Sequence, residues 1–473
     1  MVSVFTAIIS GLILSGAYAP LNWWFLLPVA VAFFLYSVTK TRNSFRIAFI
    51  FGFVFNYLTL SWSGTYVGII PVLFLVVLQS IFYLPLGFIS FKRDRYSRIW
   101  LIAPILLVAD ELRSIIPFGG FGWNRLSFSQ ANAPFSFTAA FLGDSVLSFI
   151  SILLGIAFYL LWARAQLLSV ALILVFTSLI FIWPVSSSSQ GSASILGIQG
   201  NVPQLGFDFN SRAKEVFKYH VRETDVALKR IPRKPDVIVW PENSVDVDPF
   251  KYPEVGKRVS EIARSHSIAI IVGAVLDTPQ GPENVSMMWD SKGEVQSIYK
   301  KRVLTPFGEY IPLRSFASKI SPLANNVTDF VPGNDVVLHH FKNVKAAPII
   351  CYEVINDAAV RSISKNSNLL LVQTNNATFA SSAQSMQQLN ISRIRAIENN
   401  RWLISVSTTG VSAIIDNLGQ IKHITKQNEP AYLNSNVGLI ESLTLSSRLG
   451  NWSALIVFLM SLVLYIGKRR RYV

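Results

Sequence analysis

Long apolar runs near the two ends of the chain limit what it can fold into. A membrane-crossing helix needs about 20 apolar residues, and seven candidate spans precede residue 185, with an eighth near the C-terminus. They lie near 3–19, 22–38, 45–63, 66–90, 99–117, 144–162, 166–184 and 452–467. The chain is 51% hydrophobic and only 15% charged, less charged than soluble domains usually are. We therefore expect a membrane α-helical bundle of eight spans.

The distribution of basic residues predicts the orientation of this bundle. Lys and Arg collect in alternate loops and after the last span: Lys40, Arg42, Arg46, Lys92, Arg93, Arg95, Arg98, Arg164, Lys468, Arg469, Arg470 and Arg471. Basic loops stay on the cytoplasmic side, so both termini are predicted to be cytoplasmic. Most of the net charge of +15 lies in this membrane part, where it indicates topology and predicts no nucleic-acid partner.

Three domains follow from this pattern. Residues 1–184 form the seven-span bundle, residues 185–447 form an extracytoplasmic domain, and residues 448–473 form the eighth helix with a basic cytoplasmic tail. In the middle domain, β-branched runs alternate with amphipathic stretches, which is typical of a layered α/β domain. The strand candidates are 194–200, 236–240, 268–275, 285–290, 295–300, 346–351, 368–374, 403–407 and short runs between 412 and 424, and the helix candidates are 211–230, 253–265, 357–364 and 381–400.

Three polar residues stand at the ends of predicted strands in the middle domain. They are Glu242, Lys301 and Cys351, and catalytic groups in α/β folds are common at the carboxyl ends of strands. A carboxylate can take the proton of a Cys nucleophile, and a nearby Lys can stabilise an oxyanion. Cys351 is the only cysteine, which excludes an intrachain disulfide and a cysteine-rich metal site. We predict neither a metal nor a cofactor.

Other interpretations remain open from these residues alone. A single Cys is more often a small buried hydrophobe than a nucleophile, and Glu242 and Lys301 could be ordinary surface charges. No histidine is placed convincingly for a Cys–His pair, and we interpret all five as structural: His220, His266, His339, His340 and His423. The aromatic, glycine-rich loop 116–143, which contains Trp123, is equally compatible with an interfacial belt and with a lipid-contacting platform.

Several ordered motifs together resemble the apolipoprotein N-acyltransferase family, nitrilase-superfamily enzymes of the bacterial inner membrane. They are Trp240-Pro241-Glu242, Tyr299-Lys300-Lys301, Pro306-Phe307-Gly308-Glu309-Tyr310-Ile311-Pro312 and Ile350-Cys351-Tyr352-Glu353. Further matches are Gly200-Asn201-Val202-Pro203-Gln204, Trp123 with Leu126, Ser129 and Gln130, Arg393 to Asn399, and Thr408 to Asp416. The resemblance covers essentially the whole chain, including the eight-span layout.

The resemblance implies a fold and a two-step reaction. The middle domain would be an αββα sandwich with Glu242, Lys301 and Cys351 as its triad, supported by Glu309, Tyr352 and Glu353. A phospholipid would donate an acyl chain to the Cys as a thioester, and the N-terminal amine of an S-diacylglyceryl-cysteine apolipoprotein would accept it. Contacts with substrate and membrane lipid are expected at Trp123, Phe207 and Trp240.

Two segments depart from the family pattern. The family usually shows Asn-Asp-Ala/Ser-Trp-Phe-Gly after the Cys, whereas this chain has Asn375-Asn376-Ala377-Thr378-Phe379-Ala380. The Lys usually found after Pro203-Gln204 is also absent. The alternative function, a membrane-anchored carbon–nitrogen hydrolase (an amidase), would use the same triad, but seven preceding spans are excessive for an anchor.

Overall fold

The computed structural model describes residues 1–90, 98–163, 189–202, 204–205, 213–320, 324–325, 327–379 and 381–470. The chain divides into two compact units. Unit 1 comprises Met1–Gly64, Gly68–Val185 and Leu445–Val473, and unit 2 comprises Thr65–Val67 and Ser186–Thr444.

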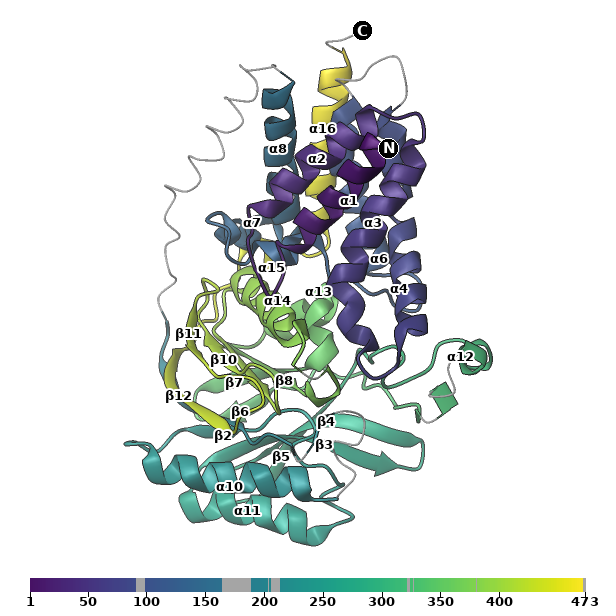
Figure 1. The fold of residues 1–473 in the computed structure, drawn as a ribbon. Helices are drawn as coiled ribbons and strands as arrows, with labels where there is room; N and C mark the ends of the chain where they lie inside the picture. Colours follow the sequence, from purple (N-terminus) through teal and green to yellow (C-terminus); the bar gives the residue numbers. More distant parts are fainter. Residues whose placement is uncertain are drawn as a thin grey trace. The chain divides into compact units, whose positions relative to one another are not determined.

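Unit 1 is helical throughout its regular structure in the described residues (Figure 1). Its α-helices are α1 (Val2–Ser15), α2 (Leu26–Thr39), α3 (Ser44–Leu60), α4 (Ile69–Ile81), α6 (Ile102–Arg113), α7 (Ala139–Leu142), α8 (Ser145–Trp162), α15 (Leu445–Leu449) and α16 (Trp452–Arg470). Helix α2 packs between α1 and α8. These helices are rich in Leu, Ile, Val and Phe, which is typical of segments buried in a bundle or in lipid.

The helices coincide with the predicted spans, but not all have the full length of a span. Ser44–Gly64, Ile69–Ser90 and Ser145–Trp162 are long and apolar enough to cross a membrane. Val2–Ser15, Leu26–Thr39 and Trp452–Lys468 are apolar but shorter, and α6 has only 12 residues and carries charge. The seventh predicted span, 166–184, lies outside the described residues. Three full-length candidates are therefore observed, and the total of eight spans stays a prediction.

A buried polar cluster in unit 1 holds the loop that contains Trp123. The Arg113 guanidinium donates to Asp110 at 2.8 Å and also to Asn124. The Asn124 amide donates to Thr59 at 2.7 Å, and the second Asp110 oxygen accepts from the backbone N–H of Leu126 at 2.9 Å. Buried charges need such partners. The cluster therefore fixes this loop to the helices.

Unit 2 contains two six-stranded sheets. The first has the order β12-β1-β2-β3-β4-β5 and the second has the order β11-β10-β9-β8-β7-β6. The strands of the first sheet are β1 (Ser192–Gln199), β2 (Val237–Val239), β3 (Ala269–Thr278), β4 (Gly281–Trp289), β5 (Val295–Lys300) and β12 (Ala431–Gly438). Those of the second are β6 (His339–Phe341), β7 (Val344–Ile350), β8 (Leu369–Thr374), β9 (Leu403–Ser407), β10 (Ala413–Ile415) and β11 (Ile421–Ile424).

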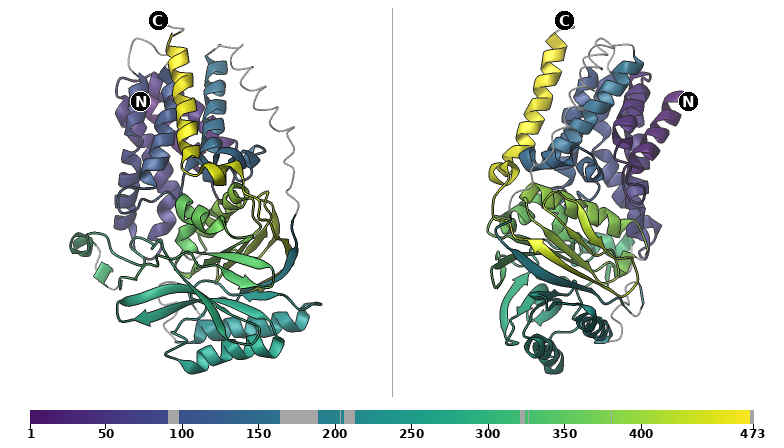
Figure 2. Two further views of the ribbon diagram at one scale, coloured as in Figure 1. Left: turned by 180° about the vertical axis from the view of Figure 1, so that it is seen from behind. Right: turned by 90° about the vertical axis from the view of Figure 1, so that its left-hand side faces the viewer.

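The sheets pack face to face and helices cover both outer faces. Helices α10 (Glu215–Arg230) and α11 (Pro253–His266) lie side by side against the first sheet, and α13 (Asp357–Ser364) and α14 (Gln384–Asn399) lie against the second (Figures 1 and 2). Side chains alternate between faces along a strand. In β2, Val237 and Val239 face the second sheet, while Ile238 faces the helices. Unit 2 is thus an αββα sandwich.

Two elements of unit 2, β12 and α12, were not predicted from the sequence, whereas β6 lies at His339 and His340, where a strand was expected. Strand β12 pairs antiparallel with β1 from Ser192↔Gly438 to Gln199↔Ala431, and its Leu433 and Val437 side chains are buried in the core. Strand β6 is a short hairpin partner of β7, and α12 (Arg314–Ile320) is a single short helix. Strand β12 lies at an edge of the first sheet, and three consecutive polar residues, Asn434 to Asn436, interrupt its apolar pattern.

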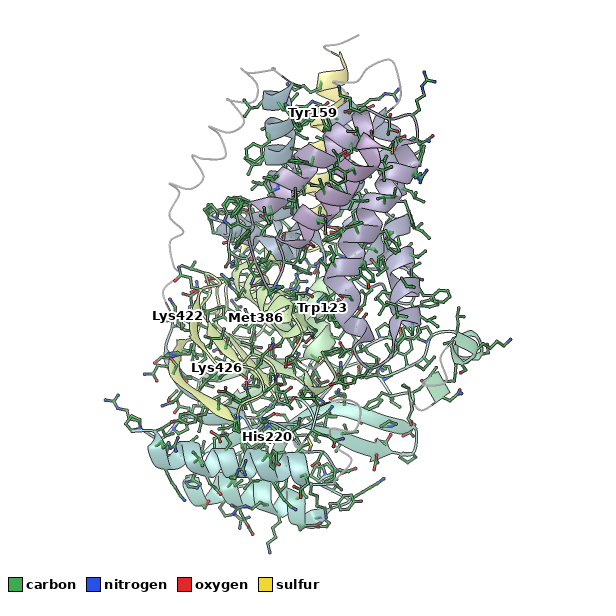
Figure 3. The ribbon with its side chains drawn as sticks, viewed as in Figure 1. Trp123, Tyr159, His220, Met386, Lys422 and Lys426 are labelled. Atoms are coloured by element: carbon green, nitrogen blue, oxygen red, sulfur yellow. The ribbon has the colours of Figure 1, made fainter. Side chains whose placement is uncertain are left out.

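Two of the five histidines are buried inside unit 2, as the structural interpretation expects. His220 of α10 packs on Trp240, with ring centroids 5.7 Å apart (Figure 3). The His339 ring contacts Ser286 at 2.9 Å and Ser297 at 2.7 Å. Burial lowers the pKa of His220 to about 4. Burial, with a smaller effect of His340, lowers the pKa of His339 to about 3.

These histidines predict that unit 2 loses stability in mild acid. A folded-state pKa below the unfolded value of about 6.5 means that the unfolded chain takes up protons first. The stabilisation is therefore complete above about pH 6.5 and falls by about 1.4 kcal/mol per pH unit for each histidine below it. Thermal unfolding measures how far the melting temperature falls between pH 7.5 and pH 5. This fall should be smaller for His339→Asn than for the control His266→Asn, in which an exposed histidine is replaced. Equal losses would contradict this prediction.

Candidate active site

The ends of four strands, two from each sheet, meet at one place in unit 2. Glu242 follows β2 and Lys301 follows β5 in the first sheet, whereas Cys351 follows β7 and Asn375 follows β8 in the second. Two hydrogen bonds join the sheets there. The Asn375 backbone N–H donates to Glu242 Oε2 at 2.8 Å, and Gln373 Nε2 donates to the Trp240 carbonyl at 2.7 Å. The structure thus brings the three sequence-predicted residues to one site.

Lys301 is almost fully buried, with 1% of its surface exposed. Its Nζ lies 2.8 Å from Glu309 Oε2 and 3.4 Å from Glu242 Oε1. Burial alone would lower the pKa of Lys301, but the two carboxylates outweigh it and the pKa lies above its ordinary value. Lys301 is therefore a fixed positive charge. The neighbouring Lys300 is half exposed and pairs with Glu283 at 2.8 Å instead.

The two carboxylates around Lys301 differ in character. Burial alone would raise the pKa of Glu309, but the Lys301 charge outweighs it and holds this pKa below its usual value. Burial raises the pKa of Glu242 above its usual value despite the opposing effect of Lys301, and the negative charge of Glu309 adds to the rise. Glu309 is thus the permanent counter-ion of Lys301. Glu242 is the carboxyl better suited to accept a proton.

Asn284 of β4 connects these two carboxylates, a role that the sequence motifs did not reveal. Its Nδ2 donates to Glu242 Oε1 and to Glu309 Oε1, both at 2.8 Å. Its backbone carbonyl also accepts from the Lys301 N–H at 2.9 Å. No sequence motif marks Asn284 as a site residue, because it lies within strand β4, away from every recognised motif. Only the structure shows its contacts with the two carboxylates.

Cys351 begins a 3₁₀ turn directly after β7 and is partly exposed. Its backbone φ is +49°, a left-handed conformation that non-glycine residues rarely adopt and that is common at functional sites. Burial of the sulfur, followed by the negative charge of Glu242, raises the pKa of Cys351 above its ordinary value. The resting site therefore holds a neutral thiol next to a base.

Glu353 joins the strand ends that carry Lys301 and Cys351. Its Oε1 accepts from the backbone N–H groups of Arg302 at 2.7 Å and Val303 at 3.1 Å. Its Oε2 accepts from the Ile350 N–H at 2.8 Å. The Tyr299 hydroxyl lies 2.9 Å from Oε1 and 3.0 Å from Oε2. One buried carboxylate therefore holds the end of β5 and the end of β7 together.

The other expected residues differ in their surroundings. Tyr352 is buried beside Cys351, and burial raises the pKa of its hydroxyl. Trp240 is fully buried in the core between the first sheet and its helices, where Nε1 donates to Thr224 at 2.9 Å. The expected substrate contact is therefore wrong for the Trp240 side chain, because core packing covers its whole surface. Phe207 lies outside the described residues.

Trp123 belongs to unit 1 and is 4% exposed. Its ring packs against Trp62 at 5.1 Å and Phe121 at 6.4 Å. Figure 3 shows Trp123 at the end of the helical bundle. A largely buried indole of this kind supports the shape of its loop, so substrate contact by Trp123 stays a prediction.

The arrangement has the parts needed for covalent acyl transfer. The charge of the Glu242 carboxylate acts on the thiol, and a fixed ammonium lies beside that carboxylate. A base activates a Cys nucleophile, and a preorganised positive charge stabilises the oxyanion that forms when the nucleophile attacks a carbonyl. Among the described residues, no group of three or more His, Cys, Asp or Glu side chains is arranged to hold a metal ion.

Glu353→Gln should destabilise this site, although glutamine has nearly the same size as glutamate. A glutamine presents N–H groups on one side, so one of the backbone N–H groups of Ile350, Arg302 or Val303 would lose its acceptor. An unsatisfied buried donor costs about 1–3 kcal/mol, and activity should fall with stability. Glu441→Gln is the matched control, because Glu441 pairs on the surface with Lys345. Denaturant unfolding that shows the same small loss for both variants would refute the role of Glu353.

Comparisons with known proteins agree along the chain. Residues 10–157 match the apolipoprotein N-acyltransferase N-terminal domain, and residues 202–437 match the carbon-nitrogen hydrolase family. The apolipoprotein N-acyltransferase of Mycolicibacterium smegmatis is 31% identical, covering 94% of this chain and 81% of that protein. The protein of the same name from Photobacterium profundum is 28% identical, covering 98% and 95%. A carbon-nitrogen hydrolase structure from Helicobacter pylori G27 is 15% identical, covering 57% of this chain and 93% of that one, with a TM-score of 0.42. The chain belongs to the apolipoprotein N-acyltransferase family.

Proposed function

We propose that this protein transfers an acyl chain from a phospholipid to the N-terminal amine of S-diacylglyceryl-cysteine in apolipoproteins, the last step of lipoprotein maturation. The observation that carries the proposal is the buried Lys301 ammonium held by two carboxylates beside the only cysteine of the chain. The name of the relatives, apolipoprotein N-acyltransferase, supports an acyl transfer to apolipoproteins.

The first half-reaction forms the acyl-enzyme. Glu242 takes the Cys351 thiol proton as the sulfur attacks the ester carbonyl of the phospholipid. Lys301, held by Glu309, stabilises the oxyanion. The tetrahedral intermediate then collapses, the proton returns from Glu242 to the leaving alcohol, and a lysophospholipid departs. The acyl chain remains on Cys351 as a thioester.

The second half-reaction uses the same groups on the acceptor. The α-amine of the apolipoprotein attacks the thioester carbonyl and loses a proton to Glu242, while Lys301 again faces the oxyanion. The carbon–sulfur bond breaks, and the proton passes to the sulfur. The products are an amide on the apolipoprotein and a free Cys351 thiol.

The alternative function is a membrane-anchored carbon–nitrogen hydrolase that uses the same triad on a small amide. Water would then replace the amine as the acceptor of the acyl group. The match of residues 10–157 to the apolipoprotein N-acyltransferase N-terminal domain favours acyl transfer, because a simple anchor would not require that domain.

Cys351→Ala should abolish acyl transfer, because the chain has no other thiol to form the thioester. Purified protein is incubated with phospholipid and a diacylglyceryl peptide, and mass spectrometry follows both acylation of Cys351 and N-acylation of the peptide. Lys300→Ala is the control and should retain most of the activity, since Lys300 pairs with Glu283 and not with the site. Substantial N-acylation by Cys351→Ala would refute the mechanism. Hydrolysis of small amides without peptide acylation would favour the alternative.

We also propose that the protein crosses the bacterial inner membrane eight times, with residues 185–447 outside and both termini in the cytoplasm. The alternation of basic loops supports this orientation. A reporter fused after Val473 should report the cytoplasm, and one inserted near Ser188 should report the outer side. The reverse pattern would place the site in the cytosol and would remove exported apolipoproteins as substrates.

A further inference from the structure

The Cys351 sulfur has a contact that the proposed reaction leaves unused. Gln388 of α14 donates from Nε2 to Cys351 Sγ at 3.8 Å, and Gln388 is only 3% exposed. Figure 3 marks the same helix at Met386. The charges that act on the thiol, Glu242, Lys301 and Glu309, come from the strand ends and the turn after β5.

A relay of hydrogen bonds determines which end of the Gln388 amide faces the sulfur. The Gly410 backbone N–H donates to Ser407 Oγ at 2.8 Å, and the Ser407 hydroxyl donates to Asn376 Oδ1. Asn376 Nδ2 donates to Gln388 Oε1 at 3.1 Å, and Gln388 Nε2 faces Cys351.

Further hydrogen bonds and a close contact with Gly410 restrict the side chains of this relay. Gln384 Nε2 adds a second donor to Gln388 Oε1 at 3.3 Å, and the Thr374 hydroxyl donates to Asn376 Oδ1 at 2.6 Å. A Cβ at position 410 would lie 2.4 Å from Asn376 Oδ1, so only glycine permits this approach. Because a side-chain network in a low-dielectric interior is strengthened when all its members are satisfied, the Gln388 amide has one orientation.

The charged residues of α14 and its neighbours are engaged elsewhere. Arg395 Nη1 pairs with Glu398 at 2.6 Å, Arg395 Nε donates to the Val354 carbonyl at 2.8 Å, and Arg395 Nη2 pairs with Asp357 of α13. Glu353, two residues after the nucleophile, accepts from backbone N–H groups. The side of the sulfur that faces α14 is thus contacted by an uncharged donor.

We propose that Gln388 is a positioning residue for the Cys351 sulfur. Its N–H holds the sulfur so that the thiol proton points to Glu242, and it stabilises negative charge on the sulfur. The inference rests on the proposed function for its place in the reaction. When the amine attacks the thioester, the carbon–sulfur bond breaks and the electron pair goes to the sulfur. Gln388 stabilises this thiolate until the proton taken by Glu242 returns to it.

Alkylation of the thiol tests this role without any lipid substrate. Because Cys351 is the only cysteine, the rate of iodoacetamide modification of the full-length protein in detergent reports on this sulfur alone. Gln388→Leu should raise the thiol pKa, shift the alkylation profile to higher pH and lower the rate at fixed pH roughly tenfold, the effect expected from one hydrogen bond to a charged acceptor.

Two nearly isosteric variants distinguish the loss of the hydrogen bond from a folding defect caused by Gln388→Leu. In Gln388→Glu, the carboxylate cannot donate once ionised, so its rate relative to wild type should fall further as the pH rises. In Asn376→Asp, the donor to Gln388 Oε1 is lost, and a rotated amide would present oxygen to the sulfur. Asn376→Asp should therefore also slow alkylation. Acyl transfer should lose kcat in all three variants, with a smaller change in KM.

Asn399→Leu is the matched control, because Asn399 is a buried amide of the same helix that bonds Ser364 and the Arg395 carbonyl. It lies about 16 Å farther along the helix, and its alkylation profile should equal that of wild type. Wild-type profiles for Gln388→Leu and Gln388→Glu would overturn the proposal, and so would an equal loss in Asn399→Leu. A wild-type protein that alkylates as expected but transfers no acyl chain would overturn the proposed function and leave this inference standing.

Discussion

The buried ammonium of Lys301 is the constraint on which the site depends. A charge removed from water is stable only when it is paired and hydrogen-bonded, and Glu309 and Glu242 both lie within 3.4 Å of it. Glu309 must turn inward from the segment after β5 to reach Lys301, and its Oε2 also accepts from the Thr305 N–H at 2.7 Å. Asn284 then holds both carboxylates. The requirement to neutralise the Lys301 charge thus determines where Glu242, Glu309 and Asn284 lie around the site.

The reactive groups belong to different sheets, so their geometry is a property of the whole sandwich. Glu242 and Lys301 follow strands of the first sheet, and Cys351 follows a strand of the second. The bond from the Asn375 N–H to Glu242 crosses between the sheets, and Glu353 joins the ends of β5 and β7. A catalytic group must be held to a fraction of an ångström, and these cross-sheet bonds hold the reactive groups in place.

The segment that departs from the family pattern has a structural consequence in this chain. Asn376 stands where the family usually has Asp, and it accepts from Thr374 and Ser407 while donating to Gln384 and Gln388. An aspartate would accept in all four directions and could not donate to the two glutamines. Asn376 therefore belongs to an amide network that ends at the Cys351 sulfur.

Local patterns in the sequence were sufficient for the apolar helices, for most strands of unit 2 and for the places of Glu242, Lys301 and Cys351, because periodicity and strand-end motifs are short-range signals. They were insufficient for β12, in which three consecutive polar residues interrupt the apolar pattern. They also did not reveal that the Trp240 side chain is buried in the core. Asn284 and Gln388 lie far from the nucleophile in sequence and act only through contacts made by the packed sheets and α14. The sequence by itself determined which reactive residues the chain carries. Tertiary packing decided which uncharged side chains contact and orient those residues. The reason is that the direction of a hydrogen bond depends on neighbours that only folding brings together.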